Sequence, residues 1–207
     1  MPTPQPGPRT LFVRDADSQV HLQVAFRAFA RHAPQIMAAR LLRRILCGGG
    51  SSRLHLDLRE RLGIVYSVDA SMAAYEETGS FAIELSTAAE NLPLAVSEVL
   101  AATARLVREP VPADELQRVR LSYFYDLEYS RDSSYDMQVR YGWGELMGLV
   151  RHIEEDVAEA AALDGAQLQQ VAQQLFQPAG LHLVAVGAWK ERERAQVERL
   201  VADYRLP

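Results

Sequence analysis

Arg59 and Tyr66 are the two residues whose types and spacing best suit chemistry on a carbonyl group. The guanidinium of arginine and the phenol of tyrosine both donate hydrogen bonds, and such donors stabilise negative charge that develops on a carbonyl oxygen. The pair stands in the segment Arg-Glu-Arg-Leu-Gly-Ile-Val-Tyr, with Gly63 between the two residues. On side-chain chemistry alone the structural interpretation is favoured, because an arginine near a helix end favours the helix dipole and tyrosine is common in strands.

The elements that must position this pair are predicted from apolar periodicity and from glycines. A helix begins near Pro34, carries a wide apolar face and ends at Gly48. Ser51 or Ser52 is expected to cap a second helix, in which three leucines at a spacing of four share one stripe. Gly63 ends that helix and a strand follows, so the arginine falls late in the helix and the tyrosine early in the strand. The leucines are Leu54, Leu58 and Leu62, and the strand covers Val65–Ser71.

The glycines between these helices, Gly48 to Gly50, permit two interpretations. Backbone N–H groups ahead of a helix can bind an anion, but the segment lacks the lysine and the spacing of a phosphate loop. A tight connection between the helices is therefore favoured. Cys47 is the single cysteine, so no intramolecular disulfide can form, and its place at the end of an apolar pattern predicts a structural thiol.

The remaining elements predict an α+β fold with a mostly antiparallel sheet packed against a layer of helices. Strands come early and once late, with helices between them, and the turn at residues 15–18 indicates a hairpin or a sharp bend. Four prolines among the first eight residues indicate a leader or interdomain linker over residues 1–10, followed by a single domain over residues 11–207. The further strands are expected at residues 11–14, 19–29, 79–87 and 181–186, and the further helices at 91–107, 113–148 with a break near 130–134, 151–162, 164–176 and 190–204.

Bulk properties exclude several classes of function. The net charge of −5 provides no basic field for nucleic acid or anionic lipid. No run of about 18 apolar residues is present, so no membrane span is expected, and the proline-rich start is no signal peptide. We expect a soluble protein, periplasmic or cytoplasmic, from a bacterium.

Other chemical residues have structural interpretations that compete with functional ones. His152, Glu155 and Asp156 resemble an inverted zinc motif whose final histidine is replaced, but acids at this point also fit an ordinary helix start. No serine–histidine–aspartate arrangement is visible in the sequence. An aromatic run is expected to form a core or an interface with a partner domain. It consists of Tyr123, Tyr125, Tyr129, Tyr135, Tyr141 and Trp143.

Two segments together resemble the second-half domain of the pitrilysin-type zinc metallopeptidases, the family of insulin-degrading enzyme and mitochondrial processing peptidase. They are Ile45-Leu-Cys-Gly-Gly-Gly-Ser-Ser-Arg-Leu54 and Leu58-Arg-Glu-Arg-Leu-Gly-Ile-Val-Tyr-Ser-Val68. The resemblance implies an enzyme assembled from homologous halves that enclose a chamber. One half carries His-x-x-Glu-His and binds zinc. The other half holds the peptide substrate through an arginine and a tyrosine, which match Arg59 and Tyr66.

This chain has no His-x-x-Glu-His motif. The resemblance therefore implies a half without catalytic or metal-binding residues of its own, inactive alone, with zinc in a partner half or subunit. A structural core subunit, like those of respiratory complexes that resemble these peptidases, is the alternative. A peptide-binding module without proteolysis is the third possibility.

Overall fold

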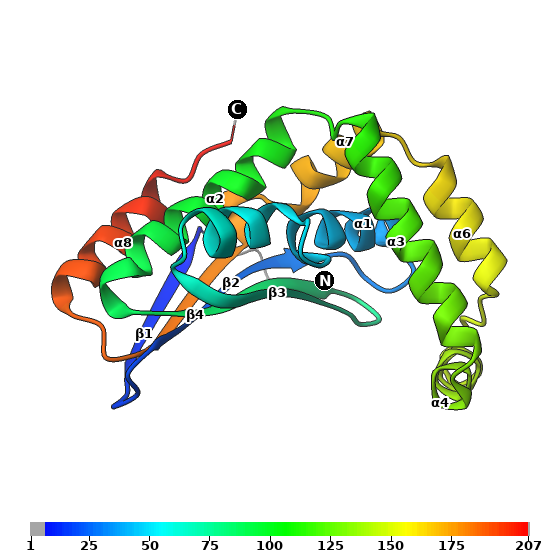
Figure 1. Cartoon of the computed structure of the whole chain (residues 1–207), viewed down its shortest axis with the longest axis horizontal. Helices are drawn as coiled ribbons and strands as arrows, with labels where there is room; N and C mark the ends of the chain where they lie inside the picture. Colours follow the sequence, from blue (N-terminus) through cyan, green and yellow to red (C-terminus); the bar gives the residue numbers. More distant parts are fainter. Residues whose placement is uncertain (1–6, 207) are drawn as a thin grey trace.

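Five strands form one sheet in the order β1-β5-β2-β4-β3, and helices cover one of its faces (Figure 1). The computed structural model describes residues 7–206. β1 and β5 are parallel and every other neighbouring pair is antiparallel, which confirms the predicted α+β class with a mostly antiparallel sheet. The strands are β1 (Arg9–Arg14), β2 (Val20–Ala28), β3 (Val65–Ala74), β4 (Gly79–Thr87) and β5 (Leu181–Gly187).

Alternation along the strands explains why only one face is covered. In β2, Val20, Leu22, Val24 and Phe26 are buried, and the residues between them point to the other face. Burying one apolar side of a sheet against helices is the main gain in free energy that an antiparallel sheet offers. The helices on this face are α1 (Ile36–Cys47), α2 (Leu92–Arg108), α7 (Gly165–Leu175) and α8 (Glu191–Asp203), with short turns η2 (Ala89–Asn91) and η4 (Pro178–Gly180).

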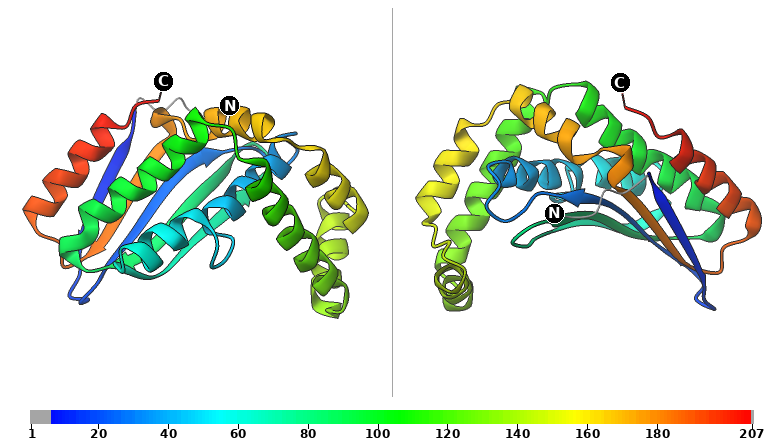
Figure 2. Two further views of the ribbon diagram at one scale, coloured as in Figure 1. Left: turned by 45° about the horizontal axis from the view of Figure 1, so that its top comes forward. Right: turned by 180° about the vertical axis from the view of Figure 1, so that it is seen from behind.

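A second group of helices stands at one end of this layer and projects past the sheet (Figures 1 and 2). We call this group, residues 113–162, the helical arm. The predicted break near residues 130–134 is confirmed, because α3 ends at Arg131 and Ser133 caps the next helix through a bond from the N–H of Asp136. The arm consists of α3 (Ala113–Arg131), α4 (Ser134–Gln138), η3 (Val139–Trp143), α5 (Gly144–Leu146) and α6 (Ile153–Ala162).

The connection from β1 to β2 is a sharp bend and not a hairpin, the other form that the sequence allowed. β5 lies between these strands, so residues 15–18 form a sharp bend and the hairpin is wrong. Carboxylate oxygens of Asp15 and Asp17 accept the N–H groups of Asp17 and Gln19, which fixes the bend. β1 also begins at Arg9, two residues inside the predicted leader, most of which lies outside the described residues. None of the helices within residues 7–206 has the length and apolar character needed to cross a membrane.

Candidate functional site

Arg59 lies on a short π-helix, η1 (His55–Arg61), that follows the glycine connection. The wider turn is visible in the bond from the N–H of Leu62 to the carbonyl of Asp57, five residues earlier. Leu54 and Leu58 are fully buried and fix this helix to the core. π-turns are rare and are often found at functional sites, where they re-aim side chains.

The predicted serine cap of this helix is wrong. The hydroxyl of Ser52 donates to the carbonyl of Gly49 at 2.6 Å, so it closes the glycine turn instead of capping the helix. Gly48 is required because a Cβ there would lie 2.5 Å from the carbonyl oxygen of Arg44. The preferred interpretation of the three glycines as a tight connection therefore fits the geometry.

Gly63 ends the π-helix as predicted, and its φ of +64° lies in the left-handed region. Its N–H donates to the carbonyl of Arg59, and the N–H of Ile64 donates to that of Leu58. On the other side, the hydroxyl of buried Thr87 donates to the carbonyl of Ile64 at 2.7 Å. The three-residue link between the helix and β3 is therefore fixed by hydrogen bonds at both of its ends.

Replacing Gly63 with alanine is expected to lower the free energy of unfolding by about 1 kcal/mol, because a Cβ is strained at this φ. Gly142 is the matched control: a Cβ meets no atom within 4 Å at either glycine, but Gly142 has no positive φ. Gly142→Ala should leave stability unchanged or raise it slightly. Urea unfolding measures both variants, and equal losses would contradict the role given to the left-handed backbone.

Tyr66 points away from the core and lies at a β-bulge in β3. Val65 pairs with Thr87 and Val68 pairs with Leu85, so β3 has one residue more than β4 between these pairs. A bulge re-aims the side chain next to it. Tyr66 is 84% exposed, and the bulge leaves Ser67 exposed as well, between buried Val65 and Val68.

The structure brings the two predicted residues together on the surface. The Cζ atom of Arg59 lies 5.5 Å from the centre of the Tyr66 ring, within range of a cation–π contact. Two residues that the sequence interpretation missed also hold the arginine. Its Nη1 donates to Nε2 of His55 at 3.4 Å, and its Nε lies 3.7 Å from a carboxylate oxygen of Glu60. The side chain stays 45% exposed, so its remaining N–H groups can reach a ligand.

His152, Glu155 and Asp156 form a helix start and an ion-pair cluster. The carboxylate of Glu155 accepts the N–H of His152 at 2.7 Å, as in a capping box. The carboxylate of Asp156 is buried between Arg140 and Arg151. Across residues 7–206, no group of three or more histidine, cysteine, aspartate or glutamate side chains could hold a metal ion.

One arrangement that the sequence did not reveal joins a serine, a histidine and an aspartate on the open face of the sheet. Nδ1 of His21 lies 2.8 Å from the hydroxyl of Ser86, and its Nε2 lies 3.1 Å from the carboxylate of Asp17. The hydrogen bond from His21 is the largest of the causes that lower the pKa of Asp17. A serine hydrolase also needs free N–H donors beside the serine. Because β4 is paired on both sides, its backbone donors serve the sheet, and we interpret the three residues as a surface network.

The thiol of Cys47 is expected to be unreactive. Burial is the main cause that raises its pKa to about 12, with a smaller contribution from the charge of Asp69. The thiol is therefore protonated at neutral pH and is a poor nucleophile. This agrees with the structural role expected from the sequence.

Comparisons with known proteins address the fold and the family. The profile of the family described as "Peptidase M16 inactive domain" matches residues 1–123, more than half of the chain. "Uncharacterized zinc protease YmxG" of Bacillus subtilis (strain 168) is 29% identical over 159 residues, which cover 76% of this chain and 39% of that protein. The chain therefore spans about two fifths of the length of this relative.

Solved structures share the fold over most of the chain. The peptidase M16 inactive domain from Pseudomonas fluorescens superposes with a TM-score of 0.78 at 23% identity, over 90% of this chain and 46% of that one. A chain of Complex III2 from Candida albicans, solved with Inz-5 bound, has a TM-score of 0.73 at 14% identity, over 92% of this chain and 49% of that one. At these identities the likeness extends to the fold alone.

Proposed function

Because the chain belongs to the peptidase M16 inactive domain family, we propose that it is the substrate-holding half of a zinc metalloendopeptidase. It would complete the active-site chamber together with a homologous half that carries the zinc. The observation that supports this function best is the pairing of Arg59 with Tyr66. Both side chains are exposed and lie side by side. The backbone between them is fixed by the left-handed turn at Gly63 and by the hydrogen bond from the hydroxyl of Thr87.

The chemistry follows from the donors that the pair presents. A guanidinium and a phenol next to each other can bind the carbonyl oxygens of an extended peptide and stabilise negative charge on the one that is attacked. The described residues do not fit a zinc site, because Asp156 and Glu155 are already bonded and no other cluster forms. The metal and its bound water would therefore belong to the other half, and this chain would position the substrate.

A structural core subunit is the second candidate. The fold of a Complex III2 chain favours it, since that chain superposes over 92% of this one. A purely structural subunit has no need for two exposed donors held on a π-helix and a bulge. The donor pair therefore favours the peptidase.

The test is a cleavage assay on the protein that contains this chain together with its homologous half. A library of fluorogenic peptides would be incubated with the assembled protein, with the chain alone and with the assembled protein after removal of zinc by a chelator. Zinc-dependent cleavage by the assembled protein, and none by the chain alone, is the expected result. Absence of cleavage from every combination would favour the structural subunit.

A further inference from the structure

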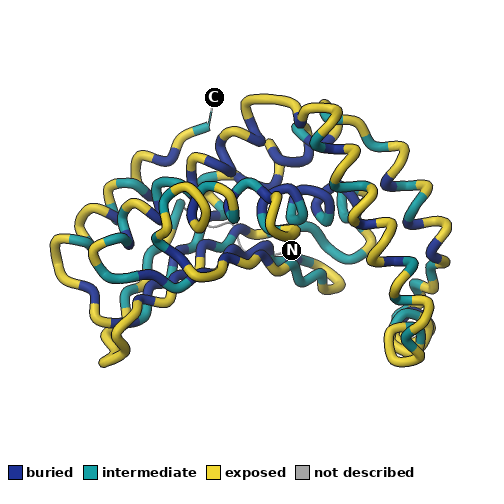
Figure 3. The backbone as a smooth tube through the Cα atoms, viewed as in Figure 1, coloured by how far each residue is buried: buried dark blue, intermediate teal, exposed yellow. Residues whose placement is uncertain are grey.

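The large apolar side chains that are exposed to solvent gather on the helical arm. Of the sixteen such side chains among residues 7–206, ten lie between residues 121 and 150. Exposed residues are frequent along the arm and at its tip (Figure 3). Monomeric proteins seldom leave many large apolar side chains close together in water, so such a concentration on one part of the fold is typical of an interaction surface. Its members are Leu121, Phe124, Tyr125, Tyr129, Tyr135, Val139, Tyr141, Trp143, Leu146 and Val150.

The sequence of α3 gives this helix two different apolar faces. Tyr123 and Leu127 are buried against the body of the domain. Leu121, Tyr125 and Tyr129 follow at a spacing of four, so they share a face that points to solvent. One apolar face suffices to attach a helix to its own domain, and the second face is available for another one.

The arm is held firmly to the body, so its exposed face belongs to the folded state. Arg44 of α1 forms an ion pair with Asp126 at 2.7 Å and stacks 4.9 Å from the ring centre of Tyr123. Arg53 and Glu115 form a bidentate pair at the base of α3. These contacts fix the orientation of the exposed aromatic residues before any partner binds.

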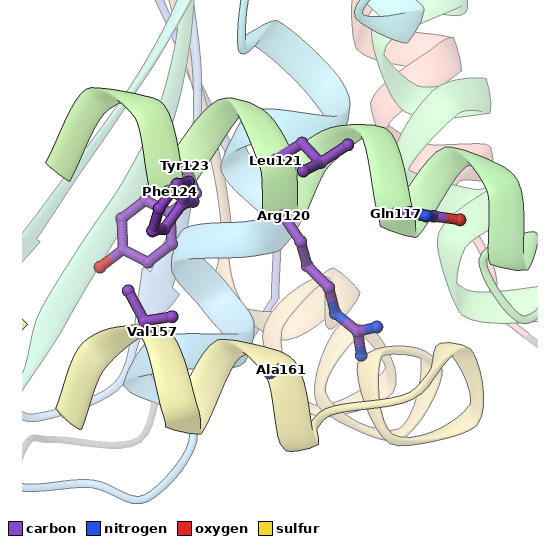
Figure 4. Close-up of a pocket in the computed structure, with 7 residues that line it drawn as sticks. All are labelled: Gln117, Arg120, Leu121, Tyr123, Phe124, Val157 and Ala161. Carbon is purple, nitrogen blue, oxygen red and sulfur yellow. The ribbon is translucent and has the colours of Figure 1, made fainter. Parts of the chain in front are cut away.

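A groove of about 190 Å³ between α3 and α6 adds shape to this surface (Figure 4). Tyr123 and Phe124 from α3 and Val157 from α6 give it apolar walls, and Arg120 reaches across to α6, where Nε donates to the carbonyl of Ala160. A groove of this size can accept one anchoring side chain from a partner. Aromatic residues around a pocket are typical of the centre of protein–protein interfaces.

We propose that the exposed apolar face of the helical arm is the surface on which the homologous half docks. This inference rests on the proposed function, because it takes the homologous half as the partner. The length of related chains favours the homologous half as the partner that covers the arm. This domain matches only 46% and 49% of two solved chains that share its fold. About one further domain of equal size is thus available in each of them to cover the arm.

Acidic residues near the exposed aromatic side chains indicate a positively charged partner surface. Asp132, Asp136 and Glu145 lie beside the aromatic residues, and no ion pair involving them is found in the described part of the chain. Uncompensated acids around an apolar centre fit a partner surface with lysine or arginine at matching positions. A second copy of this chain would bring the same acidic rim, which disfavours a homodimer through this face.

Side-chain footprinting with hydroxyl radicals tests the docking surface without any cleavage assay. Tyr125 and Tyr75 are 53% and 58% exposed in this chain, so both should be oxidised at similar rates when the chain is alone. In the assembly with the homologous half encoded in the same or the neighbouring gene, oxidation of Tyr125 and Trp143 should fall at least about fivefold. Tyr75, at the turn between β3 and β4, should be oxidised as before.

A matched pair of leucine variants tests the energetic role of the same face. Leu121 on α3 and Leu94 on α2 are 48% and 41% exposed, so a glutamate is tolerated at either position. Leu121→Glu should raise the dissociation constant of the two separately produced halves about thirtyfold or more, as at an interface centre. Leu94→Glu should leave it within about threefold. Analytical ultracentrifugation measures both constants.

The outcomes separate this proposal from the proposed function. Equal oxidation of Tyr125 in the isolated chain and in the assembly would overturn the docking surface, even if the assembly cleaves peptides. If the arm is protected from oxidation in the assembly but peptide cleavage is unchanged by Arg59→Ala, the docking surface is supported and the substrate-holding role is rejected. Dimers of the chain alone with a protected arm would identify a second copy as the occupant and overturn the proposal.

Discussion

Replacing Arg59 with alanine is expected to lower kcat of the proposed peptidase assembly about 10²- to 10³-fold. The guanidinium is one of two donors that face the proposed substrate carbonyls, and removal of one donor from an oxyanion site has an effect of this size. Its own contacts, to His55 and Glu60, lie at the surface, so the free energy of unfolding should change by less than about 0.5 kcal/mol. Steady-state cleavage of a fluorogenic peptide, together with urea unfolding, measures both quantities.

Arg61 provides the control for that substitution. It lies at the end of the same π-helix but pairs with Asp57 and Glu98, away from Tyr66. Arg61→Ala should therefore leave turnover within about twofold. A result in which both alanine variants lose turnover equally would mean that the helix end, and not the donor at position 59, is what matters.

The phenol of Tyr66 can be tested by the loss of a single oxygen. Tyr66→Phe keeps the ring that stacks on Arg59 and removes only the hydroxyl, so a fall in kcat of about 10²-fold would assign the effect to hydrogen bonding. Tyr75→Phe, at the far end of the same hairpin, should behave as wild type. Unchanged turnover in the Tyr66→Phe enzyme would reject the phenol as a donor.

Local rules account for the part of this site that the sequence predicted. Apolar periodicity and Gly63 gave the order of helix, stop and strand, because glycine is favoured where φ is positive. The resemblance then singled out Arg59 and Tyr66, which the structure brings within contact. Nothing in these steps required knowledge of distant contacts.

The features that were missed depend on pairing across the molecule. A stripe of leucines at a spacing of four fits an α-helix and a π-helix alike, so the wider turn was not predictable. The bulge at Tyr66 is defined only by the register of β3 against β4. Insertion of β5 between β1 and β2 is likewise a long-range event, which local turn residues cannot reveal.

Asp156 illustrates the same limit and leads to the largest expected effect on stability. Its side chain is only 3% exposed, and it lies 2.9 Å from Nη1 of Arg140 and 2.8 Å from Nε of Arg151. Arg40, from α1, approaches the same carboxylate at 3.9 Å. Arg40 is distant from Asp156 in the sequence and belongs to α1, so a motif that resembles a zinc site proves to be a point where the arm forms ion pairs with the body of the domain.

Asp156→Asn is expected to lower the free energy of unfolding by about 2–4 kcal/mol. The amide keeps the shape but removes the charge, which leaves three arginines close together with less compensation, and breaking a buried ion pair from one side has a cost of this order. The partial exposure of Arg151 and Arg40 places the estimate below the full penalty for a buried charge. Urea unfolding measures the loss, and hydrogen exchange over residues 134–150 should show that the tip of the arm loosens first.

Asp114→Asn is the control, because Asp114 also pairs with an arginine, Arg118, but both side chains are largely exposed. Its unfolding transition should match that of wild type. If the two variants behave alike, the buried cluster does not anchor the arm, and the ion pairs of Arg44 and Arg53 alone hold the docking surface in place. If Asp156→Asn unfolds the tip of the arm and also weakens association with the homologous half, one buried carboxylate links the fold of the arm to the proposed assembly.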